Sequence, residues 1–167
     1  MILDSKTNNK LFLICPDCYI ENRIRSKFQG NLFFITALGS VLNSIDSNFI
    51  KSVKELLVQE DITEICIVND TSCRFLESVI KGKKGYSTSA EKELKWLLSN
   101  YLYRLNHLDN IKETSTELAK HNLIHQKKRF MKTSIFKTHL ESNPIKLTMV
   151  LFDRTKDEAT IMYSLNS

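Results

Sequence analysis

Two apolar runs, each followed by a polar segment that carries cysteine, are the most informative feature of this sequence for its fold. The first is Leu11–Ile14, followed by Cys15-Pro16-Asp17-Cys18, and the second is Ile65–Val68, followed by Asn69-Asp70-Thr71-Ser72-Cys73. Short runs of β-branched and large apolar residues are typical of strands buried on both faces of a parallel sheet. Ligand sites in such sheets lie beyond the carboxyl ends of the strands. We therefore expect Cys15, Asp17, Asp70 and Cys73 to form one site.

The remaining sequence alternates between strand and helix patterns. Further buried strands are predicted at Asn31–Thr36 and Lys146–Phe152, and a hairpin then leads into an edge strand at Glu158–Ser164. A strand, a helix and a strand in this order imply parallel neighbours with right-handed crossovers. The sequence thus predicts an α/β fold with a mainly parallel central sheet of about four strands. A C-terminal antiparallel edge strand completes this sheet, and helices cover both of its faces.

Helix starts are predicted from residues that can cap a helix. Ser47 precedes an apolar stripe at helical spacing, and Thr88 with Glu91 has the spacing of a capping box. Thr114 with Glu117 repeats this spacing and is expected to open a further helix, which would reach to about His139.

The chain is long enough for one domain with a substantial core. We expect residues 10–167 to form this domain, with residues 1–9 as a polar N-terminal arm, in a chain of 167 residues. The N-terminal segment lacks the residue order of a signal peptide, and no apolar run reaches the roughly 18 residues of a membrane span. We therefore expect a cytoplasmic protein without a membrane partner.

The net charge of +5 could in principle favour a polyanionic partner. The excess positive charge is concentrated in residues 81–84 and 127–132, where no nucleic-acid motif is recognisable, so a solvated helical face explains it better. We expect no nucleic-acid partner.

The four cysteines of this sequence are not expected to form structural disulfides in a reducing compartment. Metal ligands or a redox site remain as alternatives for Cys15, Cys18 and Cys73. Cys15 and Cys18 form a Cys-x-x-Cys pair after a strand, a setting in which a thiol pKa can fall for redox chemistry. Cys66 lies in mid-strand and is expected to be only a small buried apolar residue.

With these segments placed, the chain resembles the β-class carbonic anhydrases from about Leu11 to Ser164. The family's first strand ends in Cys-x-Asp-x-Arg and its third ends in Gly-His-x-x-Cys-Gly; Cys15, Asp17 and Cys73 match these motifs. Further matches follow in the same order as in the family: Gly30, Leu32, Phe33, Gly39, Trp96-Leu97, Asn122 with Gln126, and Phe152-Asp153. The resemblance implies this family's fold, a zinc cofactor, and carbon dioxide or bicarbonate as the small-molecule substrate.

The departures from the family lie where its chemistry is located. The family's zinc-binding His falls on Asp70, and the Arg that pairs with its catalytic Asp falls on Tyr19. The Arg-Asn of its second strand falls on Thr36-Ala37. The resemblance therefore implies a degenerate site with Cys15, Asp70 and Cys73 as metal ligands and Asp17 as the catalytic carboxylate.

Charge argues against efficient hydration of carbon dioxide at such a site. Two thiolates and a carboxylate would leave a zinc site one unit negative, so the ion would acidify water less effectively. Asp17 lacks the family's Arg and can swing in as a fourth ligand, and Cys18 can instead supply a third thiolate. We expect weak or absent hydration activity.

Two other interpretations remain open. One is a thiol-redox protein that uses Cys15 and Cys18. The other is a non-catalytic interaction protein that retains the fold. The resemblance implies a homodimer in either case, because members of the family generally pair through their arms and their sheets.

Overall fold

The computed structural model describes residues 8–42, 46–83, 85, 87–105, 110–135 and 145–165. The predicted N-terminal arm, residues 1–9, lies almost entirely outside this part of the chain, and Asn9 belongs to the first strand. The predicted end of a helix near His139 also lies outside it.

The described residues form one five-stranded sheet with the strand order β2-β1-β3-β4-β5. The first four strands in sequence pair in parallel, and the last pair is antiparallel. The strands are β1 (Asn9–Ile14), β2 (Asn31–Thr36), β3 (Glu64–Asp70), β4 (Lys146–Asp153) and β5 (Glu158–Leu165). The predicted sheet, with its C-terminal antiparallel edge strand, is confirmed. Asn69 and Asp70, expected just beyond the third strand, form the end of β3.

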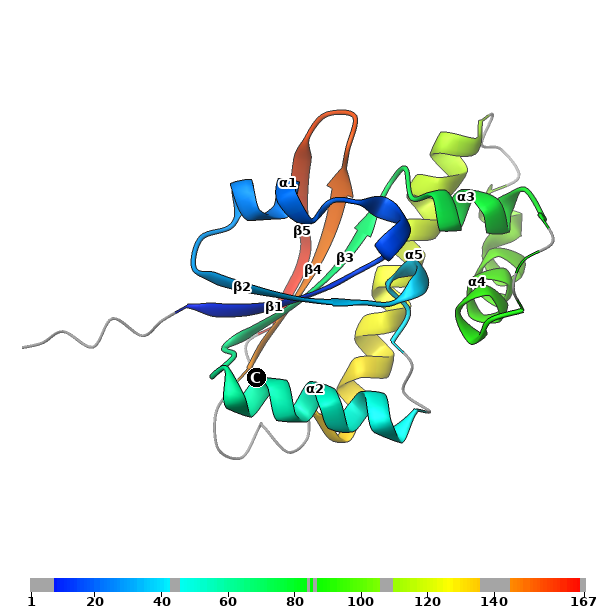
Figure 1. Cartoon of the computed structure of the whole chain (residues 1–167). Coiled ribbons are helices and arrows are strands. Elements are labelled where there is room, and N and C mark those ends of the chain that lie inside the picture. Colours follow the sequence, from blue (N-terminus) through cyan, green and yellow to red (C-terminus); the bar gives the residue numbers. More distant parts are fainter. Residues whose placement is uncertain are drawn as a thin grey trace, which may run out of the picture.

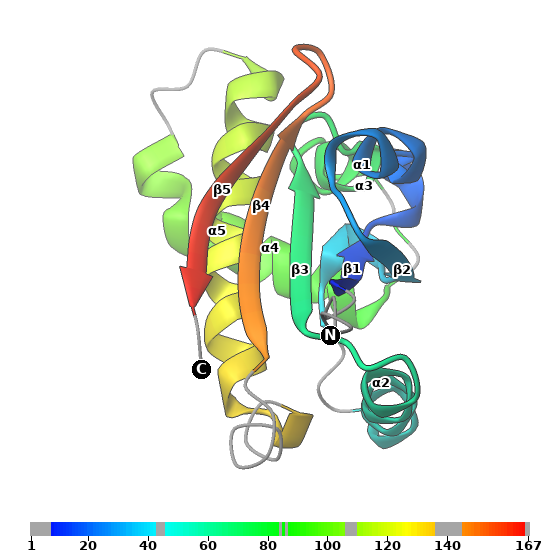
Figure 2. The same cartoon turned by 90° about the vertical axis from the view of Figure 1, so that its left-hand side faces the viewer.

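Helices cover both faces of the sheet. They are α1 (Glu21–Lys27), α2 (Ser47–Gln59), α3 (Arg74–Ile80), α4 (Ser89–Leu105) and α5 (Ile111–Lys132). Helices α1 and α2 lie on opposite faces (Figure 1), and α5 runs along β3 and β4 (Figure 2). Among the described residues, no helix combines the length and the apolar character that a membrane span requires.

The alternation of side chains along the strands divides the core into two layers. Phe12, Cys66 and Val68 face α1, α3 and α4, whereas Leu11, Ile65 and Ile67 face α2 and the second half of α5. The layer that contains Phe12, Cys66 and Val68 also contains Cys15, Cys18 and Cys73. The predicted site therefore lies at the carboxyl edge of the sheet, against α3.

Strand β2 differs from the prediction of a buried strand. It lies at one edge of the sheet, with β1 as its strand neighbour, and its apolar residues Leu32, Phe33, Phe34 and Ile35 are only half-buried. A continuous apolar run predicts a strand, but it does not distinguish a central strand from an edge strand that another surface covers.

Two of the predicted helix caps were placed wrongly. The cap of α2 is Asp46, whose Oδ1 accepts the N–H groups of Asn48 and Phe49 at 2.9 and 3.2 Å, and not Ser47. The cap of α5 is Asn110, four residues before the predicted Thr114, because Asn110 Oδ1 accepts the N–H of Glu113 at 2.9 Å. Asp, Asn, Ser and Thr all satisfy the same backbone donors, so neighbouring candidates are equivalent in sequence.

Thr88 caps α4 as predicted, because its Oγ1 accepts the N–H of Glu91 at 3.1 Å. The reciprocal bond of the capping box is shifted by one residue, since Glu91 accepts the N–H of Ser87 at 3.1 Å.

Candidate metal centre

Cys15 and Cys18 are brought together by a tight turn at the end of β1. Cys15 directly follows the strand, and Pro16 opens a 3-10 turn, Pro16–Cys18, in which the Cys18 N–H donates to the Cys15 carbonyl at 3.1 Å. Tyr19 ends the turn in a left-handed conformation with φ of 53°. The turn therefore folds Cys18 back over the end of the strand that carries Cys15.

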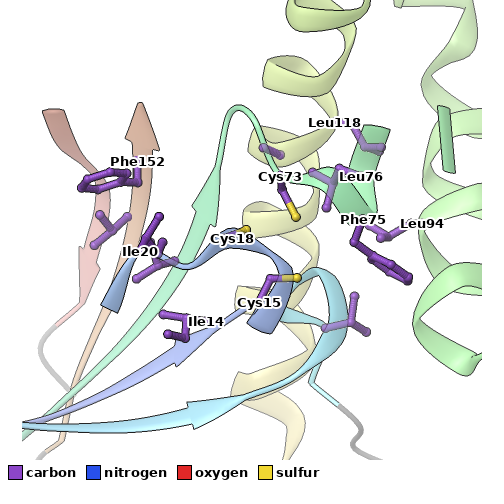
Figure 3. Close-up of a cluster of buried hydrophobic side chains, with 14 of the residues drawn as sticks. Ile14, Cys15, Cys18, Ile20, Cys73, Phe75, Leu76, Leu94, Leu118 and Phe152 are labelled. Carbon is purple, nitrogen blue, oxygen red and sulfur yellow. The ribbon is translucent and has the colours of Figure 1, made fainter. Parts of the chain in front are cut away.

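Cys73 approaches the same point from the neighbouring strand. It follows β3 and precedes the first residue of α3, and its N–H donates to the Asp70 carbonyl at 3.2 Å. The sulfur atoms of Cys15, Cys18 and Cys73 all lie within 4.8 Å of one another, and each residue is only 1% exposed. Figure 3 shows the three sulfur atoms pointing toward one another between the end of β1 and the start of α3.

This donor set fits a zinc ion. Zinc binds thiolates at about 2.3 Å in a tetrahedron, which places neighbouring sulfur atoms about 3.8 Å apart. Sulfur atoms within 4.8 Å of one another can reach this spacing by small side-chain rotations. In the part of the chain that the structure describes, no other group of three His, Cys, Asp or Glu ligand atoms is clustered in this way.

The three neighbouring thiols shift one another's pKa values. Hydrogen bonds from Cys18 and Cys73 lower the pKa of Cys15 well below its usual value and outweigh its burial, with help from the N–H groups of Gly39 and Asp17. The same contacts with Cys15 raise the pKa values of Cys18 and Cys73, and burial adds to both shifts. Cys15 is therefore the sulfur that holds negative charge most readily.

The side chain of Asp70, a sequence-predicted ligand, is engaged elsewhere. Its Oδ1 accepts the Ser72 N–H at 2.9 Å, and its Oδ2 lies 2.7 Å from the Arg154 guanidinium in an ion pair. Arg154 also donates to the Ser72 carbonyl. Burial raises the pKa of Asp70, while the Ser72 N–H and Arg154 oppose that shift. Asp70 thus stabilises the turn that carries Cys73, and its carboxylate is not among the clustered ligand atoms.

Three other residues singled out in the sequence lie outside the cluster of ligand atoms: Asp17, Tyr19 and Cys66. Asp17 is half-buried in the turn between Cys15 and Cys18, and its carboxylate is also not among the clustered ligand atoms. Tyr19, at the position of the family's Arg, points largely into solvent and is 76% exposed. Cys66 is buried in mid-strand and apart from the cluster, and burial raises the pKa of its thiol. All four cysteines are free thiols.

A surface pocket of about 410 Å³ adjoins Cys15. Its apolar side is formed by Ile14, Pro16 and Ile20, and its polar side includes Glu21, Asn22 and Thr36. No Lys or Arg of the described residues lines this pocket. Cys18 and Cys73 do not line this pocket, and Cys15, at 1% exposure, forms only part of its floor.

Sequence reasoning missed two groups, one that contacts the cysteine cluster and one that supports the turn before Cys73. One is Gly39, whose N–H donates to the Cys15 sulfur at 3.2 Å; its only signal was the match of Gly39 to the family's second-strand motif. The other is Arg154, which lies in the β4–β5 turn and gave no signal in the sequence.

Comparisons with solved structures identify the fold. A tetrameric β-carbonic anhydrase from the ascomycete Sordaria macrospora superposes with a TM-score of 0.82 at 15% identity, over 95% of this chain and 83% of that one. CafA, a β-carbonic anhydrase of Aspergillus fumigatus, gives 0.79 at 19% identity, over 93% and 76%. A Coccomyxa β-carbonic anhydrase in complex with acetazolamide gives 0.81 at 11% identity, over 99% and 77%.

The chain therefore has a β-carbonic-anhydrase-like fold, as the sequence resemblance implied. No protein-family model matches the sequence, and no curated protein is similar to it in sequence. At these levels of identity the comparisons establish the fold alone. The reaction that the protein supports depends on the residues of its site.

Proposed function

We propose that this protein is a carbonic-anhydrase-like protein that binds one zinc ion through Cys15, Cys18 and Cys73. The observation that carries the proposal is the convergence of the three buried sulfur atoms within 4.8 Å. Thiolates are ligands that zinc prefers, and three protein ligands leave a fourth position open. In this ligand set Cys18 takes the place of the family's His, and Asp70 keeps its ion pair with Arg154.

The charge of this ligand set favours weak or absent hydration of carbon dioxide. A zinc ion would supply a Lewis acid next to the pocket at Cys15, but three thiolates would leave the site one unit negative and reduce its power to acidify water. Asp17, in the turn between Cys15 and Cys18, remains the candidate catalytic carboxylate. Tyr19 cannot hold it as a guanidinium would, because a phenol carries no positive charge at neutral pH.

The metal content of purified, untagged protein tests this proposal. We expect near-stoichiometric zinc in the wild type and in Cys66→Ser, the control for loss of a buried thiol outside the cluster. Cys15→Ser, Cys18→Ser and Cys73→Ser should each lose most of the metal. Asp70→Asn should retain it, and loss of zinc in Asp70→Asn together with retention in Cys18→Ser would favour the ligand set Cys15, Asp70 and Cys73.

Stopped-flow measurement of carbon dioxide hydration tests the second part of the proposal. We expect the hydration rate to be close to the uncatalysed hydration rate, and the rate of bicarbonate dehydration to be close to its own uncatalysed rate. A robust rate that disappears in Cys73→Ser would contradict weak or absent activity and would establish a working enzyme.

A thiol-redox role is the second candidate function. It is supported by the free Cys15 and Cys18 thiols and by the lowered pKa of Cys15, for which hydrogen bonds from Cys18 and Cys73 are the main cause. Equilibration of metal-free protein with reduced and oxidised glutathione tests it. A reversible disulfide between Cys15 and Cys18, with a potential near that of the glutathione pool, would favour this role over the metal site.

We also propose that the protein acts as a homodimer in the cytoplasm. The half-buried apolar side chains of β2 favour a second copy as their cover, and free buried thiols fit a reducing compartment. A homodimer without any enzymatic activity remains the outcome if neither metal nor redox chemistry is found.

A further inference from the structure

The loop between β2 and α2 provides a hydrogen bond to the metal centre. Gly39 donates its N–H to the Cys15 sulfur at 3.2 Å. Gly39 has φ of +62°, and a Cβ there would lie 2.8 Å from Leu94 Cδ1, so a larger residue would be both strained and crowded. Glycine is therefore the residue that this position accommodates at the lowest cost while the backbone lies close to Cys15.

Two buried side-chain amides hold Gly39 in this place. Asn122 of α5 donates from Nδ2 to the Gly39 carbonyl at 2.8 Å and to Asn69 Oδ1 at 2.8 Å. Asn69 of β3 donates to the same Gly39 carbonyl at 3.2 Å. The carbonyl thus accepts two side-chain donors while the N–H of the same residue contacts the sulfur, and the orientation of Gly39 is fixed from both sides.

Gln126 connects the amides to the rest of the loop. Its Nε2 donates to Asn122 Oδ1 at 3.0 Å, and its Oε1 accepts the Leu42 N–H at 2.9 Å. Asn69, Asn122 and Gln126 are at most 2% exposed. Burying an amide is unfavourable unless it is hydrogen-bonded, so three such amides directed at one loop fix that loop strongly.

We propose that Asn122, together with Asn69, is a positioning residue of the thiolate centre: it holds the Gly39 N–H against the Cys15 sulfur and thereby strengthens metal binding. This inference rests on the proposed zinc site. A hydrogen bond to a thiolate stabilises the charged form that binds the metal. Outer groups that orient metal ligands typically contribute about 10- to 100-fold to metal affinity.

Cadmium substitution gives a direct test, because ¹¹³Cd is an NMR-active nucleus that binds thiolates. In wild-type protein loaded with ¹¹³Cd, we expect scalar coupling from the metal through the Cys15 sulfur to the Gly39 amide proton. In Asn122→Leu this coupling should weaken or vanish, and the cadmium affinity from competition with a chelator should fall by about 10- to 100-fold. Asn69→Ala, which removes one donor and leaves Asn122 in place, is the milder variant if Asn122→Leu does not fold.

Thr148→Val is the matched control. Thr148 is also buried and donates to Glu64 at 2.6 Å, at the opposite end of the sheet from the cysteines. We expect it to reduce stability but to leave the Gly39 coupling and the cadmium affinity unchanged. Equal loss of affinity in Thr148→Val and Asn122→Leu, or unchanged coupling in Asn122→Leu, would overturn the positioning role.

Failure of the zinc proposal can be distinguished from failure of this inference. If the wild type binds no cadmium, the proposed function is wrong, and the Gly39 amide proton shift in metal-free protein then decides the positioning role. That shift should move in the same direction in Cys15→Ala and in Asn122→Leu. A Gly39 shift that responds to neither variant would overturn the inference.

Discussion

Single residues decide which groups are available to a metal, and Asp70 is the clearest case. Its buried carboxylate forms an ion pair with Arg154, whose side chain is 23% exposed. Breaking a buried pair by removing one partner leaves an uncompensated charge. The turn between Asp70 and Cys73 should therefore depend on Arg154 for its stability.

We predict that Arg154→Met lowers the free energy of unfolding by about 3 kcal/mol. Urea unfolding measures this change, and the double variant Asp70→Asn/Arg154→Met should recover part of the loss. Lys51→Met is the control, since the ion pair of Lys51 with Glu55 is exposed and should contribute less than about 1 kcal/mol. Equal effects of Arg154→Met and Lys51→Met would contradict the role of the buried pair.

Glu64, the first residue of β3, should make stability depend on pH. Burial alone would raise its pKa, but the Thr148 hydroxyl at 2.6 Å and the ammonium groups of Lys10 and Lys146, at 3.1 and 3.2 Å, lower it below the usual value. A carboxyl with a lower pKa in the folded state stabilises the protein above the unfolded-state value of about 4.3. This contribution is lost as the pH falls through the folded-state pKa.

Glu64→Gln should therefore be less stable than the wild type at neutral pH, by about 1 to 3 kcal/mol. The difference should shrink as the pH is lowered through the folded-state value. Urea unfolding of both proteins from neutral pH downward measures this. A difference that stays constant with pH would show that the charge of Glu64 is not responsible.

At the scale of elements, the sequence patterns predicted the order and type of the strands but not the surroundings of each one. Ile65–Val68 and Leu32–Ile35 are both continuous apolar runs, yet the first lies in the buried strand β3 and the second in the edge strand β2. An apolar run predicts that a segment forms a strand. It does not predict which strands lie beside that segment, because the topology of the whole sheet decides this. The wrong caps at Ser47 and Thr114 have a local reason, because Asp46 and Asn110 offer the same hydrogen bonds.

The edge position of β2 leads to a prediction about assembly. Ile35 lines an apolar pocket of about 470 Å³ with Phe49, Val53 and Leu56 of α2. If a second copy covers this surface, Ile35→Glu should convert a dimer to a monomer in sedimentation velocity. Val58→Glu, at an exposed position of α2, should leave the dimer intact. A wild-type monomer would refute the proposed homodimer.

At the scale of the whole molecule, the site was only partly predictable from sequence. Cys15 and Cys73 were found because strand ends in a parallel sheet converge at one edge. Cys18 approaches Cys15 and Cys73 because of the 3-10 turn at Pro16. Asp70 is held in an ion pair by Arg154, which lies far away in the sequence, in the β4–β5 hairpin. Cys18 and Asp70 were alternatives in the sequence, and only the assembled fold separates a thiol that faces the cluster from a carboxylate that faces an arginine.

Zinc K-edge X-ray absorption on the purified protein tests whether this fold holds a metal through three thiolates. We predict about three sulfur neighbours near 2.3 Å and one lighter neighbour. The spectrum of Cys18→Ser, if it retains any zinc, should show fewer sulfur neighbours. Two sulfur neighbours with additional oxygen in the wild type would contradict the three-thiolate site in favour of Asp70, and protein without zinc would contradict the metal site itself.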